Sequence, residues 1–318
     1  MINRRVLSQL LLTVILLVPG SHALSSEPIP VVATFSILGD MVKKVGGDEI
    51  ELTTLVGANG DTHVYQPTPA DARAVKEAKL LFVNGLQFEG WLDRLVEAAS
   101  FDGQTVVATD GIDLIILDED HDEHGDHDDE GVENHDDNHD HGEFDPHGWQ
   151  SLRNAVTYID NITAALAKAY PAKATTFYNN RAVYVAEIEK LDAMVKEQLS
   201  RLPENARTVI TSHDAFKYFG RDYELRFLAP QGLSTESEAS AKDVARLITQ
   251  MREDKIGAVF VESISDPRLI EQIANETGAS IGGKLYPGAL SASDGPAASY
   301  LDMIRYNAES IAAALGGG

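Results

Sequence analysis

Residues 172 to 202 read AKATTFYNNRAVYVAEIEKLDAMVKEQLSRL, a stretch with neither Gly nor Pro. Apolar side chains recur along it at helical spacing, namely Tyr184, Ile188, Leu191, Val195 and Leu202. This pattern predicts one long rigid helix, which at about 1.5 Å per residue would extend for about 45 Å. A helix of that length can run along two packed units. We therefore interpret residues 172–203 as a linker helix between two lobes.

Short β-branched runs alternate with helical patterns before this helix. Strands are predicted at 29–35, 51–56 and 80–83, and a helix is predicted at 37–45. Another helix should begin at Thr68-Pro69, where an N-cap residue precedes a Pro at the first helical position. Repeated alternation of strand and helix predicts a parallel sheet in an N-terminal α/β lobe, residues 24–171.

A second alternating series follows the linker helix. Strands are predicted at 208–211, 225–228, 256–261 and, as two short pieces, 280–281 with 285–286. Helices are predicted at 241–253, 267–277 and 299–315. The fold class is therefore α/β, with a C-terminal lobe at residues 204–318 and a parallel sheet in each lobe.

The first 23 residues have the pattern of a secretory signal peptide. Arg4 and Arg5 form its charged region, residues 10–18 its apolar region, and Ser21-His22-Ala23 a cleavage site of small residues. The apolar region is shorter than the roughly 20 residues that a membrane-spanning helix needs. We expect cleavage before Leu24, export to a bacterial periplasm, and a mature chain that does not span the membrane.

Charge and cysteine content narrow the possible partners. The chain has no Cys, which excludes disulfides, thiolate metal sites and lipid attachment at a cysteine. Its formal net charge is −24, and such acidity disfavours nucleic acid and anionic membranes as partners. The charge favours a cation as the ligand.

Residues 118–145 differ sharply from the rest of the chain. They contain fifteen Asp and Glu, six His and no Lys or Arg. Self-repulsion and the lack of apolar residues predict a disordered insertion within the N-terminal lobe. The insertion is either a solvated tract without a ligand or a mobile collector of zinc with several weak sites. The clustering of its six His at 121–141 favours the collector.

Outside the signal peptide and the insertion, the chain has only three of its ten His. These are His63, His147 and His213, and each lies in a loop next to a predicted strand or helix. A single such His is more often an ordinary surface residue. Together they suggest a site, because ligands of open α/β sheets bind beyond the carboxyl ends of the strands. Neutral imidazoles suit zinc, copper, iron or nickel better than magnesium or calcium, and zinc is the favoured ion.

Four segments carry a resemblance to a known family, namely THVYQPTP at 62–69, DPHGW at 145–149, TSHDAFKYF at 211–219, and 295–303. In these segments the chain resembles the cluster A-I solute-binding proteins, which feed zinc and manganese ABC importers. The likeness extends over essentially the whole mature sequence. It implies two (β/α) lobes bridged by a long helix, with a metal held in the interlobe cleft by His63, His147 and His213.

The resemblance also bears on the choice of metal. Manganese members typically present a carboxylate at the position that His213 occupies here, and a His-rich insertion is a feature of zinc members. Zn(II) is therefore the expected ligand, with a manganese-binding homologue as the alternative. The implied function is periplasmic capture of zinc and its delivery to the membrane permease of an ABC importer. A zinc metallochaperone is a further candidate partner.

The chain departs from the family at one ligand. Family members generally supply an Asp from the C-terminal lobe, and the corresponding position in the segment 285–290 is Gly288. Four-coordinate zinc then needs another donor, and the candidates are water, Asp294, Glu262 or a His of the insertion. Water or an insertion donor is favoured, because Asp294 is more simply a turn residue. Glu236 and Glu238 are candidates for orienting His63 or His213.

Two other functions remain open at the level of sequence. Three His and a water also form certain catalytic zinc sites, so a zinc hydrolase is the second interpretation. The sequence offers no H-E-x-x-H pattern and no Ser or Cys nucleophile motif, so we do not expect an enzyme and assign no catalytic residue. A metal-dependent adhesin on the same scaffold is the third interpretation.

Overall fold

The computed structural model describes residues 27–117 and 143–316. The predicted signal peptide and residues 118–142 of the insertion lie outside this part of the chain. None of the helices in the described residues is long and apolar enough to cross a membrane.

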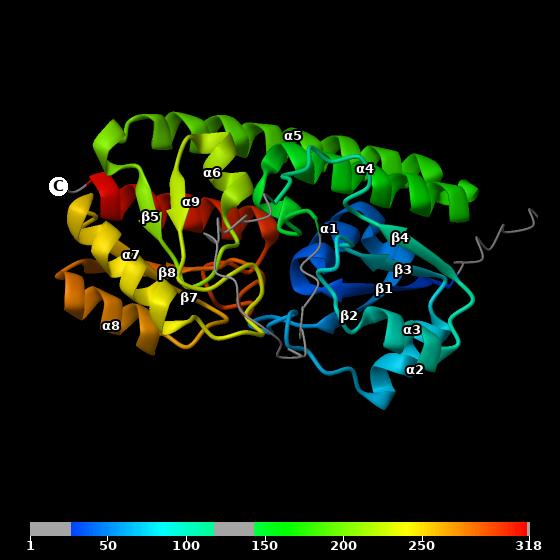
Figure 1. Ribbon diagram of the computed structural model, residues 1–318. Coiled ribbons are helices and arrows are strands. Elements are labelled where there is room, and N and C mark those ends of the chain that lie inside the picture. The colour runs from blue at the N-terminus through cyan, green and yellow to red at the C-terminus, as the bar shows by residue number, and fades with distance from the viewer. Residues whose placement is uncertain (1–26, 118–142, 317–318) are drawn as a thin grey trace, which may run out of the picture.

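The N-terminal lobe is built on a parallel sheet of four strands in the order β2-β1-β3-β4. The strands are β1 (Ile29–Phe35), β2 (Ile50–Val56), β3 (Leu80–Val83) and β4 (Gln104–Val107). Helices α1 (Ser36–Gly46) and α4 (Leu152–Ala169) cover one face, and α2 (Pro69–Glu77) and α3 (Leu92–Ala99) cover the other (Figure 1). Because both faces are covered, β3 is buried along its whole length.

The start of α2 shows how local sequence sets a boundary. The Thr68 hydroxyl accepts hydrogen bonds from the backbone N–H groups of Ala70 and Asp71, and the Asp71 carboxylate accepts one from the Thr68 N–H at 2.6 Å. This capping box and the Pro at the first helical position confirm the predicted helix start.

The C-terminal lobe repeats the architecture with the order β6-β5-β7-β8. Its strands are β5 (Thr208–Ile210), β6 (Arg226–Leu228), β7 (Ala258–Glu262) and β8 (Ser280–Leu285). Helices α7 (Ala241–Glu253) and α8 (Arg268–Thr277) lie on one side, and α6 (Lys217–Tyr223) and α9 (Tyr300–Gly316) on the other (Figure 1). The predicted pair of parallel-sheet lobes is confirmed.

Helix α5 (Ala174–Ser200) runs along both lobes, as Figure 1 shows. It contacts α1 and α4 of the N-terminal lobe and α6 and α9 of the C-terminal lobe. Its predicted apolar stripe is buried, including Tyr184, Ile188, Leu191 and Val195. These side chains belong to a hydrophobic core that is continuous between the lobes, so α5 joins the lobes by packing as well as by connectivity.

Several boundaries differ from the sequence expectations. Helix α5 has 27 residues and is preceded by a separate 3-10 turn at Pro171–Lys173. The two short pieces expected at 280–286 form the single strand β8, which passes through Gly282 and Gly283. A Cβ at Gly282 would lie 2.7 Å from the Ala314 Cβ of α9 and 2.8 Å from the Phe260 ring of β7, so a larger residue here would have to displace these side chains. Helices α3, α4 and α6 and strand β4 were not expected at all.

The insertion is shorter than predicted from composition, because residues 143–145 are part of the folded lobe. The Leu117 N–H donates to the Glu143 carbonyl at 2.9 Å, and Phe144 pairs with Ile116 in an antiparallel bridge. Asp145 is fully buried. The expectation of disorder throughout 118–145 is therefore wrong for these last three residues, whose backbone groups are satisfied by pairing with the segment before the insertion.

Candidate metal centre

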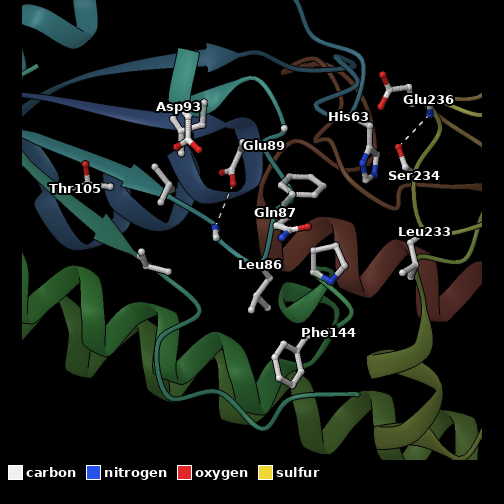
Figure 2. A pocket seen from close by; sticks show the side chains of 17 residues that line it. His63, Leu86, Gln87, Glu89, Asp93, Thr105, Phe144, Leu233, Ser234 and Glu236 are labelled. Atoms are coloured by element: carbon white, nitrogen blue, oxygen red, sulfur yellow. Dashed lines mark hydrogen bonds between the residues drawn. The ribbon is translucent and has the colours of Figure 1, made fainter. Parts of the chain in front are cut away.

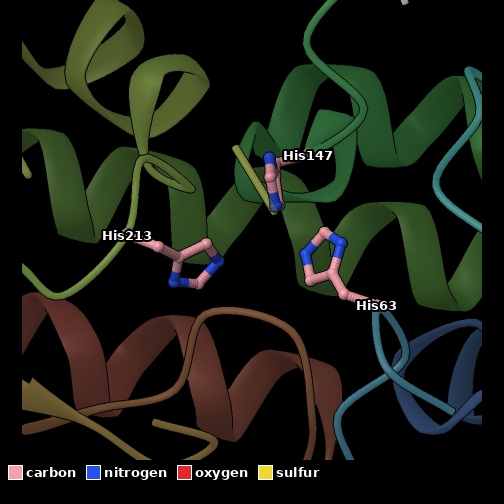
Figure 3. Close-up of side chains that lie close together, drawn as sticks. All are labelled: His63, His147 and His213. Carbon is pink, nitrogen blue, oxygen red and sulfur yellow. The ribbon is translucent and has the colours of Figure 1, made fainter. Parts of the chain in front are cut away.

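The structure brings His63, His147 and His213 together between the two lobes (Figure 3). One ring nitrogen of each lies within 4.8 Å of those of the other two, and the ring centroids are 5.5 to 5.7 Å apart. They form the only group of three or more His, Cys, Asp or Glu within residues 27–117 and 143–316 that has metal-ligand spacing. The three residues singled out by the sequence thus converge at one point.

Each His reaches this point from a loop at the end of a regular element. His63 lies in the loop between β2 and α2, and His213 follows β5, the strand paired with both β6 and β7. His147 directly precedes the 3-10 turn Gly148–Gln150 that leads into α4. Because the carboxyl ends of both sheets face the cleft, the two lobes present their loops to one another.

The His213 ring is oriented by Glu262, the last residue of β7. The Nδ1 of His213 lies 2.5 Å from the Glu262 carboxylate, and both side chains are fully buried. The other carboxylate oxygen accepts the backbone N–H groups of Ser212 and His213. Burial opposes protonation of His213, but the charge of Glu262 and its hydrogen bond outweigh burial and raise the pKa of the ring. The same carboxylate makes the free nitrogen, Nε2, a stronger donor to a metal.

The His147 ring is oriented in the same way by Asp145. One oxygen of the Asp145 carboxylate lies 2.8 Å from His147 Nδ1 and also accepts the His147 backbone N–H at 2.9 Å. Two side chains from elsewhere hold this turn. Tyr218 of α6 donates to the Asp145 carbonyl at 2.9 Å, and Asn84 at the end of β3 donates to the Pro146 carbonyl at 2.9 Å. His147 therefore has a predetermined ring orientation.

The remaining ring nitrogens of these two residues have no partner in the described chain. The Nε2 atoms of His147 and His213 are buried and make no hydrogen bond. A buried polar atom left unpaired is costly, so two such atoms facing a third imidazole need an explanation. A metal ion coordinated by the imidazoles satisfies them, and this donor set fits a borderline-soft divalent cation.

His63 is held differently, through its backbone. Its N–H donates to the Asp61 carboxylate at 3.0 Å, and the preceding carbonyl, of Thr62, accepts the indole N–H of Trp91 at 2.9 Å. Burial, reinforced by the neighbouring His147 and His213, holds the pKa of the His63 ring well below its ordinary value. The ring is therefore neutral, as a metal ligand must be.

A cavity of about 670 Å³ opens beside His63 (Figure 2). Its wall includes the loop after β3, where the buried Glu89 carboxylate accepts hydrogen bonds from the Thr34 hydroxyl and from the N–H groups of Asn84 and Gly85. This arrangement places the neighbouring Phe88 ring edge-on to His63, with centroids 4.9 Å apart. One side of the His cluster is therefore closed by an aromatic ring.

The candidates for a further donor are placed as follows. Glu262 is engaged at the Nδ1 side of His213, and Asp294 is exposed on a turn before α9. Neither belongs to the group with metal-ligand spacing. Gly288 follows Pro287, whose carbonyl accepts hydrogen bonds from Trp149 Nε1 at 2.9 Å and Gln150 Nε2 at 2.6 Å. The segment with Gly288 thus lies against the turn that carries His147.

The sequence analysis did not identify the two carboxylates that orient the His rings. Asp145 and Glu262 orient the rings, whereas Glu236 and Glu238, which the sequence suggested for this role, are exposed. The expectation for Glu236 and Glu238 is wrong for His213, because Glu262 already occupies its Nδ1. Spacing offered a signal for Asp145, since an Asp two residues before a His readily accepts that residue's N–H.

Comparison with known proteins identifies the family. The model of the family described as zinc-uptake complex component A, periplasmic, matches residues 31–314. The iron-binding protein YfeA of Yersinia pestis is 32% identical over 292 residues, 92% of this chain and 88% of that protein.

Solved structures of periplasmic metal-binding proteins are also similar to this chain. A manganese-bound periplasmic metal binding protein from Candidatus Liberibacter asiaticus has a TM-score of 0.76 and 32% identity, with 90% of this chain and 98% of that one covered. The periplasmic zinc binding protein TroA from Treponema pallidum has a TM-score of 0.80 and 28% identity, with 91% and 99% covered. The chain therefore belongs to the zinc-uptake complex component A family of periplasmic metal-binding proteins, the substrate-binding components of ABC transporters.

Proposed function

We propose that this protein captures Zn(II) with His63, His147 and His213 and delivers it to the permease of an ABC importer. The observation that carries the proposal is the convergence of three imidazoles whose two buried Nε2 atoms are unpaired. The proposal places the protein in the periplasm, after removal of the signal peptide expected at residues 1–23. A zinc metallochaperone is a second proposed partner.

The identity of the donors supports zinc. The cluster supplies three nitrogen atoms and no carboxylate oxygen. Imidazole suits zinc, whereas manganese prefers oxygen ligands and lies below zinc in the general order of affinities for such sites. The names of the relatives mention iron, manganese and zinc, so the choice of metal depends on this donor set rather than on similarity. Manganese is the second candidate.

A competition experiment tests the choice of metal. Metal-free mature protein is loaded with manganese and then titrated with zinc, while bound metal is measured by elemental analysis after desalting. We expect one zinc per chain to displace the manganese. Zinc at 100 times its dissociation constant should also stabilise the fold by about 2.7 kcal/mol, since it binds only the folded state. Retention of manganese in excess zinc would overturn the zinc assignment while leaving the site itself intact.

We propose that the His-rich insertion collects zinc through several weak sites. Clustered imidazoles and carboxylates bind the ion weakly, and their negative field attracts cations. Its ends are adjacent, because the Leu117 N–H donates to the Glu143 carbonyl, so a short Gly-Ser linker can replace residues 118–142. The deletion should remove the weak zinc equivalents and slow capture at low zinc, while one tight equivalent remains. Calorimetry and stopped-flow binding measure both effects.

A matched variant separates the contribution of the insertion's imidazoles from that of its negative charge. Replacing the six His between 121 and 141 by Asn keeps all the carboxylates of the insertion. We expect it to lose the weak equivalents but to retain part of the rate advantage, because attraction of the cation depends on the negative field. If the deletion left stoichiometry and capture rate unchanged, the insertion would be only a solubilising tract. Loss of the tight equivalent would instead make the insertion a ligand donor.

A further inference from the structure

One side-chain hydrogen bond crosses the cleft between loops that hold two of the His. The Thr235 hydroxyl, in the C-terminal lobe, donates to the Asp61 carboxylate, in the N-terminal lobe, at 2.5 Å. The other oxygen of the same carboxylate accepts the backbone N–H of His63 at 3.0 Å. Asp61 therefore joins the His63 loop to the opposite lobe through its two oxygens.

The Thr235 segment is in turn fastened to His213. Gln231 forms a parallel bridge with His213, and the Asp214 N–H donates to the Gly232 carbonyl at 3.0 Å. The Gln231 amide closes the turn by donating to the Thr235 carbonyl at 3.4 Å and to the Ser237 carbonyl at 2.5 Å. A continuous series of contacts thus runs from the backbone of His63 to that of His213.

The central bond of this series is only part-buried. Asp61 and Thr235 are both half-buried and border a cavity of about 500 Å³ that lies beside Ser212. Water can therefore compete with the Thr235 hydroxyl for the carboxylate, so this bond can open without disturbing the core. The nearby backbone bond from the Asn59 N–H to the Leu290 carbonyl, at 2.8 Å, also joins the lobes and does not depend on either side chain.

We infer that Asp61 and Thr235 form an interlobe latch that positions the His63 loop against His213 and sets how quickly the bound metal leaves. This inference rests on the proposed metal capture at the three His. The latch acts after the metal has entered, because it holds two ligand loops at their coordinating separation. Its loss should therefore accelerate dissociation more than it changes association.

Variants at Thr235 test the latch. Thr235→Val keeps the shape but removes the hydroxyl, whereas Thr235→Ser keeps the donor. We expect zinc to leave Thr235→Val about tenfold faster, in line with loss of one hydrogen bond to a charged group. Thr235→Ser should restore the wild-type rate, and the association rate should change little in both. Thr249→Val is the control, because its hydroxyl bonds only within α7, to the Ala245 carbonyl. Stopped-flow transfer of zinc to a chelator measures dissociation.

Two further measurements complete the test. In an Asp61→Ala background, Thr235→Val should have no additional effect, because its partner is already missing. In metal-free protein, hydrogen exchange in the 57–65 loop should be faster in Thr235→Val than in the wild type, a readout independent of zinc. Equal dissociation and equal exchange in Thr235→Val and wild type would overturn the latch. Failure of the wild-type protein to bind zinc would overturn the proposed function, and the exchange comparison would still decide on the latch.

Discussion

Replacing His63, His147 and His213 together by Ala should abolish tight zinc binding. One ring nitrogen of each imidazole lies within 4.8 Å of those of the other two, so the triple variant leaves no ligand cluster among the described residues. Each single replacement should lower affinity by more than the roughly 10- to 100-fold typical of losing an outer partner of a ligand. Competition with a chromophoric chelator measures the affinities. A triple variant that still bound zinc tightly would show that the site lies elsewhere.

The single variants differ in how far a loss of zinc affinity can be separated from a loss of fold stability. His147→Ala and His213→Ala leave the buried Asp145 and Glu262 carboxylates without their ring partners, and an unpaired buried charge destabilises a fold. His63→Ala removes a half-buried ring that is positioned through its backbone, so it is the cleanest test. Thermal unfolding of each metal-free variant is the control. Glu262→Gln should give the smaller loss expected for a residue that only orients a ligand.

Gly288→Asp should slow the release of zinc by about tenfold, because a carboxylate attracts the dication more strongly than water does in a partly desolvated cleft. The substitution fits the structure, since the nearest atom to a Cβ at Gly288 is the terminal carbon of Ile264 at 3.6 Å. The adjacent Pro287 carbonyl contacts Trp149 and Gln150, beside His147. Chelator-triggered dissociation measures the release rate.

Two control proteins are needed to interpret the zinc release rate of Gly288→Asp. Gly288→Asn adds a side chain of the same shape without the charge and should slow release much less. The Asp substitution is also made in the protein that lacks residues 118–142, because a His of the insertion would compete with the new carboxylate for the fourth position. Slower release only in the shortened protein would identify an insertion His as the natural donor. Unchanged release in both proteins would contradict the placement of Gly288 at the metal.

The sequence by itself determined the architecture and the composition of the candidate site. Helical and strand periodicities are local properties, so they predicted the two α/β lobes, the long helix and the exact bounds of α7. The three His could be selected by counting, because no other His lies outside the insertion and the signal peptide. Their position next to strand ends then predicted a shared site, since parallel strands present their carboxyl ends together.

Only the tertiary structure decided what surrounds these His. Glu262 lies 49 residues from His213, and Thr235 lies 174 residues from Asp61, so no local pattern could pair them. The same holds for Glu143 to Asp145, whose composition predicted disorder but whose backbone is ordered by pairing with the segment that ends at Leu117. Hydrogen bonds between distant segments depend on how the elements pack. Local sequence specifies the elements, whereas packing specifies which carboxylate orients which imidazole.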